Sequence, residues 1–252
     1  MSCIFCKLVT LIRRQFKRKR IYSDDEINCY YASLVKCAGL DIQVANILNS
    51  QKDKNYAPII YHLQQGVEKL TKAEMILRKA ISIDELKEIN HKTPQAFMLE
   101  LNKAIKQSKV GSFIKELVST SELKEAEKLI KKQNKIINSS EQELNGLLTF
   151  YDAQKEQGIT NQLYKDAKKE LSPELLNNYS QERTDNYMNL FFLSWCTFPH
   201  AELTRYPNKK INPWEYNSDK GIVQVIPLIL KKTKESLNYM KENINYNQKN
   251  NK

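Results

Sequence analysis

The stretch Tyr61-His-Leu-Gln-Gln-Gly-Val-Glu-Lys-Leu-Thr-Lys-Ala73 decides the fold that we predict for this chain of 252 residues. Apolar and small residues recur every three or four positions in and around it, which places them on one face of a long helix. Polar residues with the same spacing form a second face, which on the pattern alone is typical of solvated surface. The apolar face contains Ile59, Leu63, Val67, Leu70, Ala73, Leu77 and Ala80, and the polar face contains Tyr61, Gln65, Glu68 and Lys72.

A second long helix is predicted just before this one. Ser23 and Glu26 have the spacing of a capping box, in which each side chain accepts a hydrogen bond from the other's backbone N–H. Apolar residues at helical spacing then continue to about Asn49. Residues 50–56 are polar and predict a turn, and Pro58 suits the first turn of the following helix. Two long helices joined by so short a turn must lie antiparallel.

Residues 64–73 contain the pattern QQxxEKxxKA, which resembles the core motif of the HEPN family (higher eukaryotes and prokaryotes nucleotide-binding domain). Arg205-Tyr206-Pro207 is similar to the RYP segment that follows a late helix in many HEPN proteins, and His91 matches a histidine before their third helix. The resemblance covers roughly residues 23–110 and 183–245. It implies an all-α antiparallel helical bundle, a homodimer, and binding of nucleotide, RNA or a protein partner in a toxin–antitoxin or defence system.

The domain organisation follows from the same patterns. We expect a basic amphipathic segment or tail at 1–22, one HEPN-like helical domain at 23–246, and a frayed tail at 247–252. Residues 111–180 are predicted to be a helical insertion, in which Ser140 and Glu143 form another capping box. This insertion could extend the bundle, cover a groove or bind a partner.

Three further features are expected along the chain. Residues 81–92 are predicted to be a connector, and Thr93-Pro94 to open another helix. The last helix is expected to carry Pro227 in its first turn or to kink there. Only 6 Gly and 7 Pro in the chain argue against a loop-rich or doubly wound fold.

The net charge of +11 is concentrated at the N-terminal end. Residues 1–20 carry no acidic residue, so the rest of the chain is only mildly basic, and the overall charge says little about what the folded domain binds. This segment could contact an anionic membrane, bind nucleic acid phosphates or be a tail without a role in the fold, and we favour a tail or surface anchor. Its basic residues are Lys7, Arg13, Arg14, Lys17, Arg18, Lys19 and Arg20.

The cysteines and the N-terminal segment favour a cytoplasmic protein, which the basic segment could hold at the membrane surface. Five cysteines are an odd number and lack the density of a disulfide scaffold. The N-terminal segment lacks the apolar core and cleavage site of a signal peptide. Cys3 and Cys6 have the spacing of half a zinc site, but nothing completes it, so no metal and no cofactor are expected.

No standard catalytic constellation is found in the sequence. HEPN ribonucleases carry Arg-x4-6-His, in which the histidine exchanges a proton and the arginine stabilises phosphate charge. No arginine here has a histidine at that spacing, and His200-x4-Arg205 holds the two residue types in reverse order. Five residues along a helix rotate the two side chains by about 140° relative to each other. His200 and Arg205 are therefore weak catalytic candidates, and structural roles for both are the simpler interpretation.

The sequence thus favours a HEPN-type binding module without catalytic activity. Lys69, Lys72 and Arg205 are the residues that we expect to face phosphate, and Tyr61 and Tyr206 are candidate stacking surfaces. Long lysines more often cover apolar surface and tyrosines more often pack, which is the competing interpretation. Two alternative functions are a divergent, metal-independent HEPN ribonuclease and a membrane-surface adaptor anchored by residues 1–20.

Overall fold

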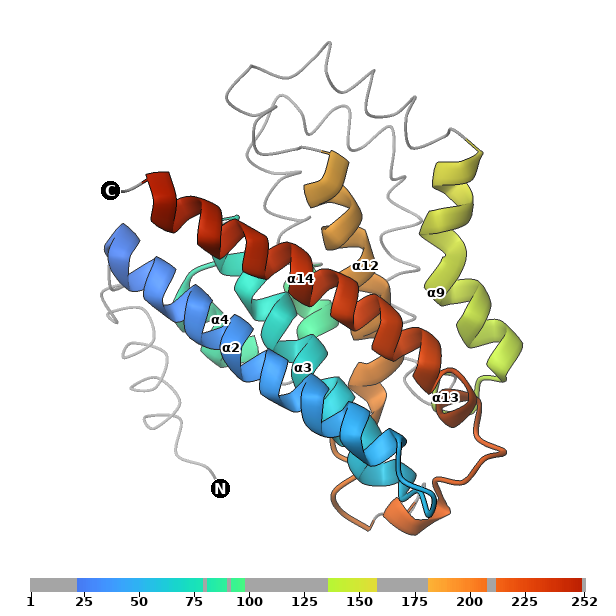
Figure 1. Cartoon of the computed structure of the whole chain (residues 1–252). Helices are drawn as coiled ribbons and strands as arrows, with labels where there is room; N and C mark the ends of the chain where they lie inside the picture. Colours follow the sequence, from blue (N-terminus) through green and yellow to red (C-terminus); the bar gives the residue numbers. More distant parts are fainter. Residues whose placement is uncertain are drawn as a thin grey trace, which may run out of the picture.

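A computed structural model describes residues 22–78, 81–89, 92–97, 136–157, 181–207 and 212–250 of the chain. These residues form helices and turns and contain no strand, which confirms the predicted all-α class. Figure 1 shows the helices packed as a bundle. The helices are α2 (Asp24–Asn49), α3 (Tyr56–Leu77), α4 (Ile83–Ile89), α9 (Glu141–Glu156), α12 (Gln181–Thr197), α13 (Gly221–Gln224) and α14 (Ile226–Asn250), with the 3-10 turns η1 (Phe198–His200) and η2 (Pro213–Glu215).

Helices α2 and α3 form the predicted antiparallel pair (Figure 1). The capping box at the start of α2 is present: the Glu26 backbone N–H donates to Ser23 Oγ at 3.2 Å, and the Ser23 N–H donates to Glu26 Oε2 at 2.9 Å. The helix ends at Asn49, and after a short polar turn α3 begins at Tyr56. A local capping box therefore sets where α2 begins, and the polar turn separates it from α3.

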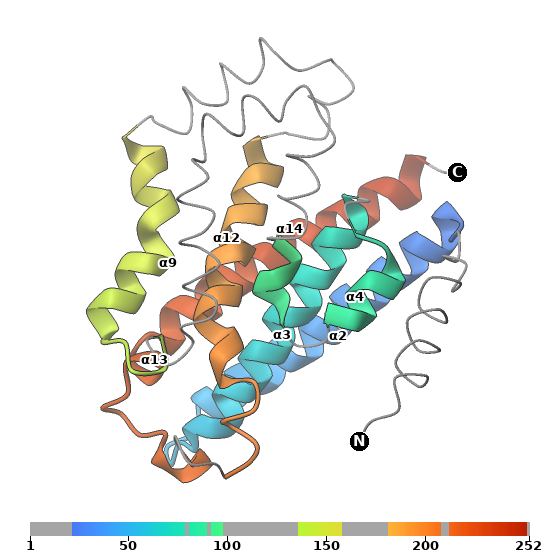
Figure 2. The same cartoon turned by 180° about the vertical axis from the view of Figure 1, so that it is seen from behind.

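Helix α3 is the central element of the bundle. It packs against α2, α12 and α14, and Figure 2 shows it from behind, with α4 and α12 beside it. Its apolar face is almost completely removed from solvent, with Leu63, Leu70 and Met75 at 1% exposure or less. Burial of such side chains is the largest favourable contribution to the stability of a fold of this kind.

Close approach of α2 to α3 depends on the absence of a side chain at Gly66. A Cβ atom built there would lie 2.9 Å from Cγ1 of Ile42, which is itself buried. Gly221 has a similar role where α13 begins, because its Cβ would lie 2.2 Å from the backbone oxygen of Ser139, just before α9. Both glycines permit contacts between elements that any larger residue would push apart.

Polar side chains buried inside the bundle connect α3 to α12. Glu74 on α3 is 0% exposed, and its Oε2 accepts a hydrogen bond of 3.0 Å from Asn186 Nδ2 on α12. The guanidinium groups of Arg78 and Arg183 lie 3.7 and 3.9 Å from Glu74 Oε1, and Arg78 also covers the ring of Tyr187 at 4.4 Å. A carboxylate can be held in such an interior only with partners of this kind.

The predicted connector at 81–92 was wrong, because it contains α4. Ser82 and Glu85 form a capping box that the prediction overlooked: Ser82 N–H donates to Glu85 Oε2 at 2.9 Å and Glu85 N–H donates to Ser82 Oγ at 3.2 Å. Ile83 and Leu86 are buried against the core, so packing stabilises a helix too short to persist by itself. Residues 93–97 are helical, as Thr93-Pro94 predicted.

Pro227 lies in the first turn of α14, which confirms one of the two positions predicted for it. A break at Val225 separates α13 from α14. Helix α14 continues to Asn250, and the frayed tail at 247–252 stays a prediction. Ile244 still packs against the core, which fixes the helix close to its end.

The predicted insertion contributes α9 to the bundle. Leu144 and Leu148 of α9 are 1% exposed, and the helix packs against α12, α13 and α14. Its capping box at Ser140 and Glu143 is present as predicted. His91, most of residues 111–180 and the basic segment at 1–22, apart from Tyr22, lie outside the described residues.

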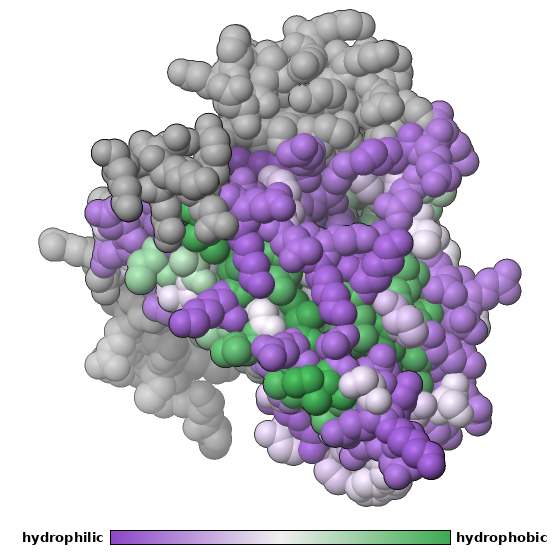
Figure 3. Space-filling model, viewed as in Figure 1, coloured by the Kyte–Doolittle hydropathy of each residue, from purple (hydrophilic) through white to green (hydrophobic). Residues whose placement is uncertain are grey.

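The described surface is mainly hydrophilic, and three exposed apolar residues gather on α2. Leu40, Val44 and Ile47 are 57%, 37% and 51% exposed, and their spacing places them on one face of the helix. Figure 3 shows apolar surface over this part of the molecule. Among the described helices none has the length and hydropathy needed to cross a bilayer.

Two glycine substitutions test the close approach of α2 and α3. Gly146 lies in α9, where an added Cβ would meet nothing within 4 Å, so Gly146→Ala should raise the free energy of unfolding by up to about 1 kcal/mol. Gly66→Ala has the same intrinsic helix preference but must displace Ile42, so it should lower the free energy of unfolding by about 1–3 kcal/mol. Urea unfolding measures both. Equal stabilisation by the two substitutions would contradict the tight contact at Gly66.

Candidate functional site

The polar face of α3 forms one continuous chain of hydrogen bonds. Lys72 Nζ donates to Glu68 Oε1 at 2.7 Å, Gln64 Nε2 donates to Glu68 Oε2 at 3.0 Å, and Gln65 Nε2 donates to Gln64 Oε1 at 2.6 Å. Lys69 Nζ then donates to Gln65 Oε1 at 3.3 Å and to Asp41 Oδ2 on α2 at 2.7 Å, while His62 Nδ1 lies 3.0 Å from Asp41 Oδ1. We call these residues the α3 polar chain: Asp41, His62, Gln64, Gln65, Glu68, Lys69 and Lys72.

The α3 polar chain balances its charges internally. The two lysines that we expected to face phosphate are engaged with carboxylates, Lys69 with Asp41 and Lys72 with Glu68. Gln64 and Glu68 are buried, at 1% and 5% exposure, so these contacts are part of the packing between helices. A phosphate group would compete with a carboxylate already bound to each ammonium group. The motif that carries the HEPN resemblance therefore has an evident structural role here.

Three of the five predicted binding residues lie together at another place. The guanidinium carbon of Arg205 is 5.4 Å from the ring centroid of Tyr61 on α3 and 5.4 Å from that of Tyr206. Arg205 Nε donates to the backbone oxygen of Ala201 at 3.0 Å, which fixes the side chain on the turn that follows η1. We call Tyr61, Arg205 and Tyr206 the Arg205 cluster. It joins residues from two distant parts of the sequence.

The Arg205 cluster is accessible, and no carboxylate of the described residues pairs with its positive charge. Tyr206 is 61% exposed, and Arg205 and Tyr61 are partly exposed. Within the described parts of the chain, Arg205 forms no ion pair, and its terminal Nη groups donate no hydrogen bond. Such a guanidinium can donate two parallel hydrogen bonds to a phosphate, and exposed aromatic rings beside it can stack on a base.

His200 has a structural environment that does not suit proton transfer. It is 1% exposed, its Nδ1 lies 2.8 Å from the hydroxyl oxygen of Tyr216, and the two rings meet edge to face. Burial lowers the pKa of His200 from its ordinary value of 6.5 to about 3, so the imidazole is neutral at neutral pH. A substrate cannot reach this ring, and the ribonuclease alternative gains no support from it.

The backbone explains why His200 and Arg205 have different surroundings. Helix α12 ends at Thr197, and the chain continues as the 3-10 turn η1, with Pro199 in its first positions. The next residues turn again, with Thr204 N–H donating to the His200 oxygen and Arg205 N–H to the Glu202 oxygen. His200 consequently lies among buried residues, whereas Arg205 lies against Tyr61 near the surface.

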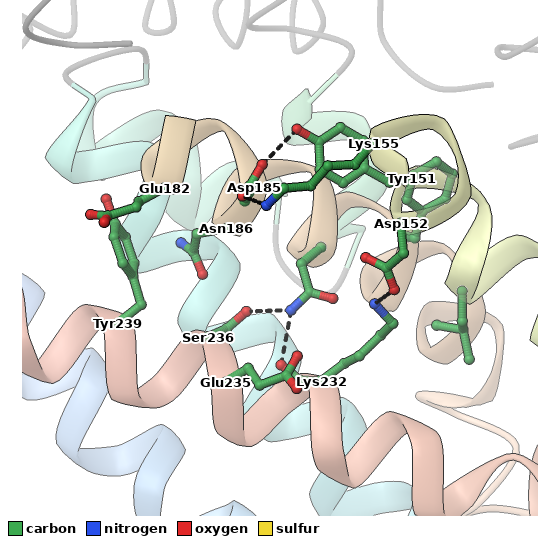
Figure 4. A pocket seen from close by; sticks show the side chains of 13 residues that line it. Tyr151, Asp152, Lys155, Glu182, Asp185, Asn186, Lys232, Glu235, Ser236 and Tyr239 are labelled. Atoms are coloured by element: carbon green, nitrogen blue, oxygen red, sulfur yellow. Dashed lines mark hydrogen bonds and ion pairs between the residues drawn. The ribbon is translucent and has the colours of Figure 1, made fainter. Parts of the chain in front are cut away.

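A further concave site, which the sequence analysis did not identify, lies between α9, α12 and α14 (Figure 4). It has a volume of about 310 Å³. Lys232 Nζ donates to Asp152 Oδ2 at 2.7 Å, Tyr151 donates its hydroxyl to Asp185 Oδ1 at 2.8 Å, and Lys155 is paired with Asp185. Its residues come from three separate helices and form no sequence motif, so no local signal could have located it.

Comparisons with known proteins do not assign a function to any of these sites. Models of protein families, curated proteins and solved structures gave no significant match to this chain. In the part of the chain that the structure describes, no group of three or more His, Cys, Asp or Glu side chains is arranged to hold a metal ion.

The burial of His200 predicts a specific loss of stability in acid. Below pH 6.5 the unfolded chain takes up a proton at this histidine, while the folded protein does so only near pH 3, so stability should fall as pH decreases through this window. In His200→Phe the free energy of unfolding should depend less on pH, by up to about 1.4 kcal/mol per pH unit. Chemical denaturation at several pH values measures this slope. Identical slopes in both proteins would show that His200 takes up its proton over the same pH range in the folded and the unfolded protein.

Proposed function

We propose that this protein is a HEPN-type binding module that contacts RNA or nucleotides through the Arg205 cluster. The observation that carries the proposal is the Arg205 guanidinium, which lies beside the rings of Tyr61 and Tyr206 and forms no ion pair with the described residues. The resemblance of residues 64–73 and 205–207 to HEPN motifs supports the same proposal and adds a toxin–antitoxin or defence setting.

Arg205 is held in position before any ligand binds. Cation–π contact with two rings and the hydrogen bond from Nε to Ala201 hold Arg205 in place before a ligand arrives. An arginine that is already ordered loses less conformational entropy on binding a phosphate. Stacking of one base on an aromatic side chain contributes about 1–3 kcal/mol and tolerates different base sequences. Together these contacts suit weakly sequence-dependent recognition of a single strand or a nucleotide.

The HEPN resemblance also implies a homodimer, which we include in the proposal. The exposed residues Leu40, Val44 and Ile47 supply an apolar face of α2 that such an interface could use. This face and the Arg205 cluster are made of different residues, so dimerisation and binding can be measured separately.

Substitution of Arg205 tests the binding proposal. Fluorescence anisotropy with a short labelled single-stranded RNA, in a chelating buffer and with cleavage followed on a gel, should show binding without cleavage. Arg205→Ala should weaken the affinity by about tenfold, because it removes both the phosphate contact and the ordered cation beside the rings. Arg205→Lys should give an intermediate affinity, since an ammonium keeps the charge but not the planar fork.

Matched controls separate this site from general charge attraction. Lys231→Ala removes one exposed positive charge from α14 and should leave the affinity nearly unchanged. Lys72→Ala should lower the melting temperature, because its partner Glu68 is buried. The affinity of the folded protein for RNA should change little. If Arg205→Ala and Lys231→Ala weaken RNA binding equally, the Arg205 cluster is not the site. Absence of binding to RNA and nucleotides would favour a protein partner.

A further inference from the structure

Two aromatic side chains are the most exposed large apolar residues in the described parts of the chain, Trp214 at 71% and Tyr206 at 61%. Tyr206 belongs to the Arg205 cluster, whereas Trp214 is the middle residue of η2 and is not part of the sites described above. An indole ring left in water forgoes the stabilisation that burial of its large surface would give. Folding does not explain the exposure of Trp214, but a ligand that stacks on the ring would.

The fold attaches the segment that carries these two rings at both of its ends. At the start of the segment, Arg205 Nε donates to the backbone oxygen of Ala201 at 3.0 Å. Near its other end, the Tyr216 hydroxyl oxygen lies 2.8 Å from Nδ1 of His200. Because His200 and Ala201 are consecutive residues, both attachments are made to one turn. Figure 2 shows this part of the chain in orange, between α12 and α13. Loops whose ends meet in this way frequently carry function.

Tyr206 and Trp214 lie next to these two attachments. Tyr206 directly follows Arg205, and its backbone N–H donates to the Glu202 oxygen at 3.1 Å. Trp214 precedes Tyr216 by two residues, which is at most about 7 Å of backbone. Tyr216 is 5% exposed and packs in the core, so it fixes the end of η2. Both exposed rings are therefore presented by one attached segment of the surface.

Hydrogen bonds within η2 hold the backbone of Trp214 in place. The Asn212 N–H donates to Glu215 Oε2 at 3.1 Å, and Asn212 Nδ2 donates to Glu215 Oε1 at 3.1 Å. Pro213 restricts the backbone at the first position of η2. An aromatic side chain on an ordered backbone loses little conformational entropy when a ligand stacks on it.

The charges beside the two rings give them different roles. Next to Tyr206, the Arg205 guanidinium can bind a phosphate. Next to Trp214, the backbone hydrogen bond from Asn212 lowers the pKa of the Glu215 carboxyl group, which keeps it ionised. A carboxylate repels phosphate, so the Trp214 ring is suited to the face of a base. Two stacking surfaces and one phosphate contact exceed what a mononucleotide, with its single base, can occupy.

We propose that Trp214 is a second stacking position beside the Arg205 cluster, and that the combined site binds single-stranded RNA several nucleotides long. One base stacks on Tyr206, a phosphate binds Arg205 and a further base stacks on Trp214. This inference rests on the proposed function and narrows its ligand from RNA or nucleotides to a single strand. Bases within a double helix stack on one another and do not offer their faces to a protein.

Substitution of Trp214 tests the proposal with ligands of two lengths. Anisotropy and competition measurements at constant ionic strength compare hexauridylate with uridine monophosphate, because only the longer ligand can reach both rings. Trp214→Ala should weaken the affinity for hexauridylate by about tenfold, through loss of one stacked base, and should leave that for uridine monophosphate unchanged. Phe150→Ala removes another exposed aromatic ring, on α9, and should change neither affinity.

Tryptophan emission reports the contact directly. The chain contains 2 Trp, and Trp195 is only 8% exposed, so a base that stacks on the surface quenches mainly Trp214. Hexauridylate should quench the emission of the unmodified protein. Trp214→Phe retains Trp195 and should lose this quenching. Melting curves establish that each variant is folded, so a loss of binding cannot be mistaken for unfolding.

The outcomes separate this inference from the proposed function. Unchanged affinity for hexauridylate in Trp214→Ala, an equal loss in Phe150→Ala, or unquenched emission at saturation would overturn the inference. If Arg205→Ala still weakens RNA binding in any of these cases, the proposed function stands and Trp214 is left to a protein partner. If the unmodified protein binds neither ligand, the proposed function and the inference fail together.

Discussion

The buried carboxylate of Glu74 is the constraint on which the rest of the bundle depends. A charge with no exposure to solvent can exist only where opposite charges and hydrogen-bond donors surround it, and here these come from Arg78, Arg183 and Asn186. Because two of the partners lie on α12, helices α3 and α12 can pack in only one register without leaving a charge unpaired. Burial is the main cause of the raised pKa of Tyr31 on α2 and of Tyr239 on α14, and the negative charge of Glu74 contributes to both shifts.

That register also determines what the bundle can offer to ligands. The bond from Asn186 Nδ2 to Glu74 fixes the orientation of the Asn186 amide on the side of α12 that faces α3. On the opposite part of α3, packing against the segment after α12 brings Arg205 to Tyr61. The pocket is lined by residues of α9, α12 and α14, whereas the Arg205 cluster combines Tyr61 of α3 with the segment that follows η1.

The sequence predicted the parts of this structure that depend on local chemistry. The capping boxes at Ser23 and Ser140 and the spacing of apolar residues in α2 and α3 were enough to place those helices and to predict an all-α bundle. The capping box at Ser82 was overlooked because α4 is short and its apolar pattern is brief. Contacts between distant segments were beyond such reasoning. The residues around Arg205 in the sequence do not indicate that Tyr61 lies beside it. Those around His200 do not indicate that it is buried against Tyr216. The pocket beside α12 exists only because α9 packs there.

The α3 polar chain has a consequence for genetics. Five of its seven residues belong to the motif at 64–73 that a comparison by motif would select for mutation, yet each is linked to its neighbours, and the chain runs from Lys72 on α3 to Asp41 on α2. Removing a single member leaves a charge or an amide without its partner. A screen for loss of function would therefore recover alleles throughout this helix through lower protein abundance. Such alleles would map the folding requirements of the bundle, and only variants that accumulate normally would report on what it binds.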